Sequence, residues 1–207
     1  ANDWDIINAL DWVYTNARTY NITAVNMSIG DDGCYRESDI NPLLWREQYL
    51  QALKDMGIFV ACASGNDGYL KGVSYPAASK YAVSVGGTWA SNDYSNYIVY
   101  WDDATQWNPG GGSVPARMAD NGPQANNIMV MTNRYTSTDD GKLDLLAPGA
   151  VITSTYPIAL DTTDGEADGF TALMGTSMAS PHAAAASMLV RQAMEIAGLL
   201  DPDPAKQ

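Results

Sequence analysis

Helical and strand-like patterns alternate along the N-terminal part of this chain, and this alternation restricts the fold more than any other feature. Residues 5–20 carry apolar side chains at every third or fourth position, which indicates an amphipathic helix. A strand at 24–29, a second amphipathic helix at 43–56 and an apolar strand at 58–63 follow it. Because strands that alternate with helices form parallel sheets, we predict an α/β fold with three layers. Its mostly parallel sheet should carry helices on both faces.

The composition agrees with a single globular domain. A chain of 207 residues with 46% hydrophobic content can bury a substantial core. Its net charge of −13 at pH 7 argues against nucleic acids and anionic membrane surfaces as partners. No segment approaches the length of a membrane span, and no signal sequence is present. These properties suit a soluble, secreted protein.

The motif Gly-Thr-Ser-Met-Ala-Ser-Pro-His at residues 175–182 precedes a helical stretch of small residues at 183–197. A serine near a helix N-terminus is a candidate nucleophile, because unpaired N–H groups there favour developing negative charge. It still needs a general base, usually a histidine oriented by a carboxylate. The chain's single histidine, His182, lies five residues after Ser177, about 140° around a helix. We expect a buried structural histidine bonded to a backbone group, and thus a nucleophile without its base.

Five segments in order along the chain resemble the subtilisin-like serine proteases, or subtilases. They are residues 25–30, 57–66, 75–78 with 82–87, 143–149 and 175–182. Subtilases use a triad of aspartate, histidine and serine, with the first two in Asp-Thr-Gly-type and His-Gly-Thr-His-type motifs. Neither motif is present here. The resemblance therefore implies the C-terminal two thirds of a subtilase catalytic domain, with its N-terminal part missing and no activity of its own.

The resemblance assigns a role to each matched segment. Ser177 would be the nucleophile, and Asn66, at the end of an apolar strand, would donate a hydrogen bond to the oxyanion beside the Ser177 N–H. Without the family, Asn66 would be interpreted as an ordinary turn residue. A cis peptide bond is expected between Tyr75 and Pro76. The peptide substrate would lie along one strand edge and against one wall of a specificity pocket with room for a large apolar residue. The strand edge consists of Ser28, Ile29 and Gly30, and the pocket wall consists of Ala63, Ser64 and Gly65.

The implied function is that of a serine endopeptidase, which hydrolyses peptide bonds through an acyl-enzyme on Ser177. Its partners would be a peptide or protein substrate and the missing N-terminal part of its own domain. A non-catalytic peptide-binding module derived from a subtilase is the alternative. An α/β-hydrolase is disfavoured, because Ala179 replaces the last glycine of Gly-X-Ser-X-Gly and His182 follows the serine too closely.

Metal ions and cofactors are not required for this chemistry. Calcium could bind between paired carboxylates, but no EF-hand spacing organises them and we assign no ligands. These pairs are Asp31 with Asp32, Asp102 with Asp103, and Asp139 with Asp140. Cys34 and Cys62 either form one disulfide or remain two free thiols, and the sequence leaves both alternatives open.

Two regions depart from the compact spacing of the family. Residues 89–140 are polar and loop-rich, which predicts an inserted or enlarged surface region. The glycine run at 108–113 lies within it. We interpret this run as a flexible turn, because the Gly-Lys-Ser/Thr signature of a phosphate-binding loop does not follow it. At the C-terminus, two prolines prevent the last helix from continuing. Residues 201–207 are therefore expected to form an exposed tail.

Overall fold

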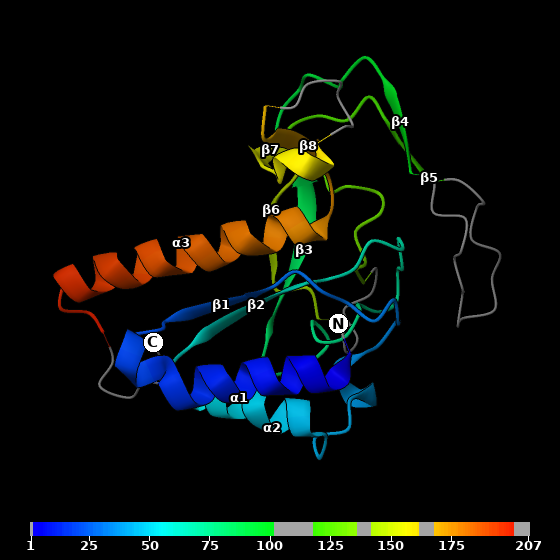
Figure 1. Ribbon diagram of the computed structural model, residues 1–207. Helices are drawn as coiled ribbons and strands as arrows, with labels where there is room; N and C mark the ends of the chain where they lie inside the picture. The colour runs from blue at the N-terminus through cyan, green and yellow to red at the C-terminus, as the bar shows by residue number, and fades with distance from the viewer. Residues whose placement is uncertain (1, 102–117, 136–141, 162–167, 201–207) are drawn as a thin grey trace.

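The computed structural model describes residues 2–101, 118–135, 142–161 and 168–200. Its centre is a parallel four-stranded sheet in the order β1-β2-β3-β6. The strands are β1 (Ala24–Met27), β2 (Phe59–Ala63), β3 (Val83–Trp89) and β6 (Leu145–Ala150). Helix α3 (Thr176–Ile196) lies on one face, and helices α1 (Asp3–Tyr20) and α2 (Trp45–Asp55) lie on the other (Figure 1). This arrangement confirms the predicted fold class.

Helix α1 begins two residues earlier than the apolar pattern suggested, because Asn2 and Asp5 form a capping box. The Asn2 side chain accepts a hydrogen bond from the Asp5 N–H, and the Asp5 carboxylate accepts one from the Asn2 N–H. These bonds satisfy N–H groups that the first helical turn leaves without partners. The helix ends at Tyr20, and Asn21 caps it in a left-handed conformation with a φ of 52°. Leu10 and Ala17 are buried against the core shared with α2 and the sheet.

Strand β2 is buried on both faces, which explains its unbroken apolar sequence. Val60 and Cys62 point into the core beneath α1 and α2, whereas Ala61 packs toward α3. On the α3 side most of the contacting side chains are alanines, including Ala179 and Ala183. Small residues on both surfaces let the helix approach the sheet closely. This approach brings the first turn of α3 to the ends of the central strands.

Two small antiparallel pairs and two short 3-10 helices complete the described structure. The pairs are β4 (Ile98–Trp101) with β5 (Met118–Asn121), and β7 (Ile152–Thr155) with β8 (Phe170–Leu173). The 3-10 helices are η1 (Glu37–Asp39) and η2 (Ile158–Leu160). Strands β4 and β5 belong to the predicted insertion at 89–140. Its glycine run, residues 136–140 and the predicted tail at 201–207 lie outside the described residues.

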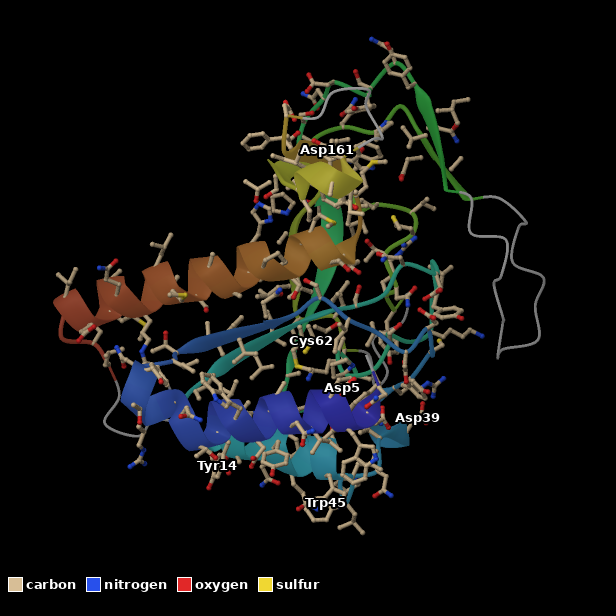
Figure 2. All side chains as sticks on the ribbon, in the orientation of Figure 1. Asp5, Tyr14, Asp39, Trp45, Cys62 and Asp161 are labelled. Carbon is tan, nitrogen blue, oxygen red and sulfur yellow. The ribbon has the colours of Figure 1, made fainter. Side chains whose placement is uncertain are left out.

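Both cysteines are free thiols, so the disulfide alternative is wrong. Cys62 lies between the sheet and the two helices below it (Figure 2), where it is fully buried. Burial penalises the thiolate and raises the pKa of Cys62 to about 12. Cys34 is partly exposed, and burial is again the main cause that raises its pKa.

We expect the buried Cys62 thiol to make stability depend on pH in the alkaline range. An unfolded thiol ionises near pH 8.5, while the folded thiol stays protonated up to about 12. Between these values the unfolded state loses a proton that the folded state keeps, so the unfolding free energy falls by up to about 1.4 kcal/mol per pH unit. Denaturant unfolding at several alkaline pH values should show a shallower decline for Cys62→Ala than for the wild type. Equal declines would contradict this assignment.

Candidate active site

The predicted site residues meet where the parallel strands end. Strands β1 and β2 are in register, with Met27 opposite Cys62, so the segments that follow them leave the sheet at the same edge. In open α/β sheets this carboxyl edge is where ligands bind. The first turn of α3 reaches the same place, because Thr176 contacts Asn66 and Ser28 contacts Ser177. Segments distant in sequence therefore build one site.

Ser177 is the second residue of α3 and is partly buried. Within the part of the chain that the structure describes, its hydroxyl and its backbone N–H have no hydrogen-bond partner. Unpaired N–H groups at a helix N-terminus, together with the helix dipole, favour negative charge. The residue thus presents a free hydroxyl beside a free donor.

The backbone carbonyl of Ser177 is anchored by Ser28. Pro181 lies inside α3 and has no N–H, so it cannot donate the usual helical hydrogen bond to the carbonyl four residues earlier. The Ser28 hydroxyl donates to that carbonyl instead, at 2.7 Å. Asn26 in turn donates to the Ser28 oxygen at 3.0 Å. The proline therefore frees a carbonyl that links the nucleophile's residue to the end of β1.

Asn66 has one fixed orientation beside the helix. Its Oδ1 accepts hydrogen bonds from the Thr176 N–H and the Thr176 hydroxyl, both at 2.9 Å. Because a backbone N–H can only donate, the atom facing it must be the amide oxygen. The Nδ2 group therefore points away, and no described residue accepts a hydrogen bond from it. The site then holds two unpaired donors, Asn66 Nδ2 and the Ser177 N–H.

Thr176 is a site residue that the sequence reasoning missed. Its side chain is fully buried, and its hydroxyl oxygen also accepts a hydrogen bond from the Gly65 N–H at 3.2 Å. Before it, Gly175 has a φ of 149°, a backbone conformation that side chains with a Cβ rarely adopt. Threonine at a helix start is common, and nothing in the sequence shows that its hydroxyl binds a loop 110 residues away.

The predicted substrate-binding residues flank this centre. Gly30 is exposed and Ile29 packs partly against the core, whereas Ala63 and Ser64 are buried. The Ser64 carbonyl accepts the Ser74 N–H at 2.9 Å. A preference for a large apolar side chain stays a prediction.

His182 is exposed, so the expectation of a buried histidine is wrong, although the expected backbone bond is present. Its Nδ1 lies 2.7 Å from the Met178 carbonyl, and since a carbonyl only accepts, Nδ1 carries the proton. The ring borders a groove of about 630 Å³ between α3 and β6 instead of being covered. No other histidine exists in the sequence. In the described structure no hydrogen bond joins this ring to Ser177.

Other sequence expectations concern the surroundings of the site. The Tyr75–Pro76 peptide bond is cis, as predicted. Among the described residues, no group of three or more His, Cys, Asp and Glu side chains is arranged to hold a metal ion. One oxygen of Asp31 accepts the N–H groups of Gly33 and Tyr75, while residues 102, 103, 139 and 140 lie outside the described part. No helix in the described ranges has the length and apolar character of a membrane span.

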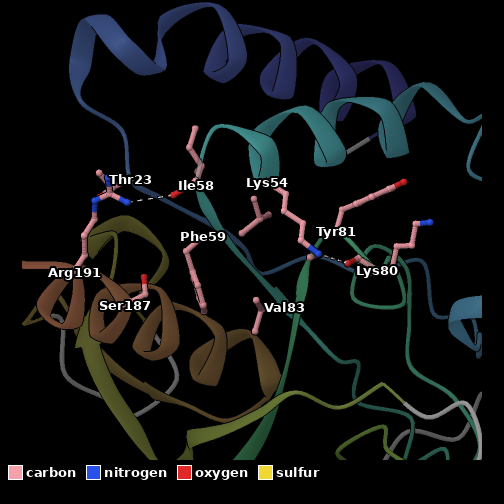
Figure 3. A pocket seen from close by; sticks show the side chains of 12 residues that line it. Thr23, Lys54, Ile58, Phe59, Lys80, Tyr81, Val83, Ser187 and Arg191 are labelled. Atoms are coloured by element: carbon pink, nitrogen blue, oxygen red, sulfur yellow. Dashed lines mark hydrogen bonds between the residues drawn. The ribbon is translucent and has the colours of Figure 1, made fainter. Parts of the chain in front are cut away.

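A separate cavity of about 210 Å³ lies at the opposite edge of the sheet (Figure 3). Its lining includes Thr23, just before β1, and Phe59, the first residue of β2, together with Lys54 and Arg191. Lys54 donates to the Lys80 carbonyl at 3.2 Å. Because Ser177 and Asn66 stand at the carboxyl ends, this cavity is no part of the candidate active site.

Comparison with known proteins agrees with this geometry. The sequence profile of the subtilase family matches residues 1–206. Over 187 residues the chain is 27% identical to subtilisin BL of Lederbergia lenta, which covers 90% of this chain and 47% of that protein. It is 33% identical over 133 residues to a cell wall-associated protease of Bacillus subtilis (strain 168), covering 64% of this chain and 9% of that protein. The structure of sphericase superposes with a TM-score of 0.60 at 19% identity, over 98% of this chain and 53% of sphericase. The chain thus spans about half the length of subtilisin BL.

Proposed function

The chain belongs to the subtilase family, and we propose that it is part of a serine endopeptidase that forms an acyl-enzyme on Ser177. One observation carries the proposal: Asn66 bonds Thr176, the residue before Ser177, and within the described ranges neither Asn66 Nδ2 nor the Ser177 N–H has a hydrogen-bond partner. The Asn66 oxygen is fixed by Thr176, so its donor is already oriented before substrate binds. Donors that need no reorganisation are the main source of electrostatic catalysis in acyl transfer.

The reaction would proceed in two steps. Ser177 Oγ attacks the scissile carbonyl carbon while a histidine takes its proton, and the carbonyl oxygen becomes an oxyanion bound by the two donors. The intermediate collapses, the peptide C–N bond breaks and the leaving amine takes the proton from the histidine. Water then attacks the acyl group by the same route and releases Ser177. No metal or cofactor takes part in these steps.

The substrate would bind as an extended peptide. Its backbone would pair with Ser28, Ile29 and Gly30 beyond β1, a form of strand addition in which main-chain hydrogen bonds supply affinity. The side chain preceding the scissile bond would enter between this segment and the one formed by Ala63, Ser64 and Gly65. Both segments adjoin the first turn of α3, because Ser28 bonds the Ser177 carbonyl and Gly65 bonds Thr176.

The base and its aspartate would come from a part of the catalytic domain outside this chain. Strand β1 pairs with β2 alone in the described structure, so its other edge is available for a further strand. A groove of about 270 Å³ separates α1 from β1 and is lined mainly by apolar side chains such as Ile6, Leu10 and Val25. Apolar side chains in an open groove are more stable when another protein segment covers them than when they face water. We propose that the remainder of the domain covers this groove.

We also propose that the complete protein acts outside the cell on peptide or protein substrates. The name of one relative, a cell wall-associated protease, supports this location. The acidic net charge of −13 supports a soluble protein without nucleic-acid partners.

The test is to read and express the complete coding sequence. An upstream open frame with an Asp-Thr-Gly-type and a His-Gly-Thr-His-type motif is expected, and the purified product should hydrolyse a chromogenic peptide. One observation favours the alternative, a non-catalytic peptide-binding module: the single histidine of the sequence bonds the Met178 carbonyl, and no described hydrogen bond joins it to Ser177. It predicts a product that binds peptides and releases no chromophore, and that result would overturn the peptidase proposal.

A further inference from the structure

Asn133 is a fully buried polar residue outside the predicted site, and it binds the loop that carries Asn66. Its Oδ1 accepts the backbone N–H groups of Asp67 at 2.9 Å and Tyr69 at 3.1 Å. The backbone N–H of Asn133 donates to the Gly65 carbonyl at 3.0 Å. Asn133 therefore contacts the backbone on both sides of Asn66, at Gly65 and at Asp67.

The other end of the Asn133 amide is also fully used. Its Nδ2 donates to the Asp67 carboxylate at 3.0 Å and to Ser74 Oγ at 3.3 Å. An asparagine amide offers two donors and two acceptor positions, and all four are occupied. A buried polar group with every position satisfied fixes its neighbours in one arrangement.

The segment around Asn133 ties this loop to the central sheet. Gly68 donates to the Met131 carbonyl and Arg134 donates to the Tyr69 carbonyl, both at 2.8 Å. Between them, the Thr132 hydroxyl exchanges hydrogen bonds with the backbone of Gly87 in β3, at 3.0 and 3.1 Å. The loop is thus fastened to β3 through residues 131–134.

From these contacts we infer that Asn133 is a positioning residue for the oxyanion donor, an inference that rests on the proposed peptidase function. Asn66 is held from two sides: Thr176 fixes its side chain, and Asn133 fixes the backbone before and after it. Glycine at 65 is part of this arrangement, because a Cβ there would lie 2.2 Å from Asn133 Nδ2. A displacement of about 1 Å in a catalytic group can cost a hundredfold in rate. Asn133 prevents such a displacement without touching the substrate.

The substitution Asn133→Asp makes this role titratable. When protonated, the new carboxyl can accept the two N–H groups and donate one hydrogen bond to Asp67; when ionised, it cannot donate and faces a second carboxylate. Burial and the Asp67 charge should both raise the pKa of the new carboxyl at position 133 above the ordinary value. Three other titratable groups lie in this region. The Arg134 side chain donates to the Val130 and Thr132 carbonyls, and the Tyr69 hydroxyl donates to the Asp32 carbonyl. The third is the Cys34 thiol, whose pKa is raised in part by the Asp67 charge.

In the complete enzyme, we expect Asn133→Asp to lower kcat by at least about tenfold at neutral pH with little change in KM. Divided by the wild-type value at each pH, its kcat should rise as the medium becomes more acidic and the carboxyl protonates. In an Asn66→Ala background the same change should have little further effect, because both act on one donor. An additive loss, or a ratio independent of pH, would show a general structural role and overturn the inference.

Thr132→Val is the comparison variant, since it removes two buried hydrogen bonds to β3 and keeps every hydrogen bond between Asn133 and the loop. It should lower the melting temperature, and its kcat relative to the wild type should not depend on pH, because it introduces no titratable group. Hydrogen exchange gives a readout without activity: the Asp67 and Tyr69 amides should exchange faster in Asn133→Ala and remain protected in Thr132→Val. Unchanged exchange in Asn133→Ala contradicts the inference. An inactive wild type with this exchange pattern would instead refute the proposed function alone.

Discussion

Replacing Ser177 with alanine in the complete protein should abolish hydrolysis of a peptide substrate, with kcat reduced on the order of 10⁴- to 10⁶-fold. This range comes from serine proteases in general. The loss follows from chemistry, because alanine has no oxygen with which to form the acyl-enzyme. Substrate binding should persist, since the peptide would contact the segments after β1 and β2. Steady-state kinetics combined with peptide binding to the variant separates the two effects.

Ser180→Ala is the control for this prediction. Ser180 lies in the same helix, is fully buried, and has a hydroxyl with no hydrogen-bond partner in the described structure. Removing that oxygen should leave kcat within about twofold, because no interaction is lost. Substantial turnover by the Ser177 variant would contradict the assignment of the nucleophile.

Asn66→Ala should reduce kcat by about 10²- to 10³-fold, equivalent to about 3 to 4 kcal/mol of transition-state stabilisation. This magnitude was established on subtilisin, a member of the same family, and is borrowed from it. The reason is that the Nδ2 donor acts on the oxyanion and contributes little to ground-state binding, so KM should change little. Equal changes in kcat and KM would indicate a different role for Asn66.

Thr176→Val gives a graded comparison for the same donor. Valine keeps the backbone N–H that holds the Asn66 oxygen but removes the hydroxyl that also holds it and that accepts the Gly65 N–H. A net loss of about 1 to 2 kcal/mol is typical for such bonds, so kcat should fall about five- to thirtyfold. The expected order of kcat is wild type, then Thr176→Val, then Asn66→Ala. A valine variant as impaired as the alanine variant would mean that Thr176 acts on more than this donor.

The sequence predicted the elements that depend on local pattern. The periodicity of residues 5–20 and the apolar run at 58–63 correspond to α1 and β2, and their alternation predicted the parallel sheet. Because parallel strands end at one edge, residues after β1 and β2 were expected to lie together, and they do. The family motifs pointed to Ser177 and Asn66, which the structure brings to one helix end.

The parts that sequence could not supply depend on contacts between distant segments. Thr176 and Asn133 fix Asn66 through hydrogen bonds to residues 110 and 66 positions away, and no spacing rule encodes such pairs. The exposure of His182 depends on what covers the outer face of α3. One of these contacts has a partial signal in the sequence. Because Pro181 has no N–H, the Ser177 carbonyl must lack its helical donor. The identity of the replacement donor, Ser28, is known only from the structure.

The central claim is that this chain carries the nucleophile and the oxyanion donors of a subtilase but lacks the base that activates them. Fluorophosphonate labelling, with the adduct located by mass spectrometry, tests this claim most directly. We predict that Ser177 is labelled in the complete protein and that residues 1–207 alone are not labelled. Labelling of Ser177 in the isolated chain at the rate of the complete protein would contradict the account, because the serine would then be activated without an external histidine.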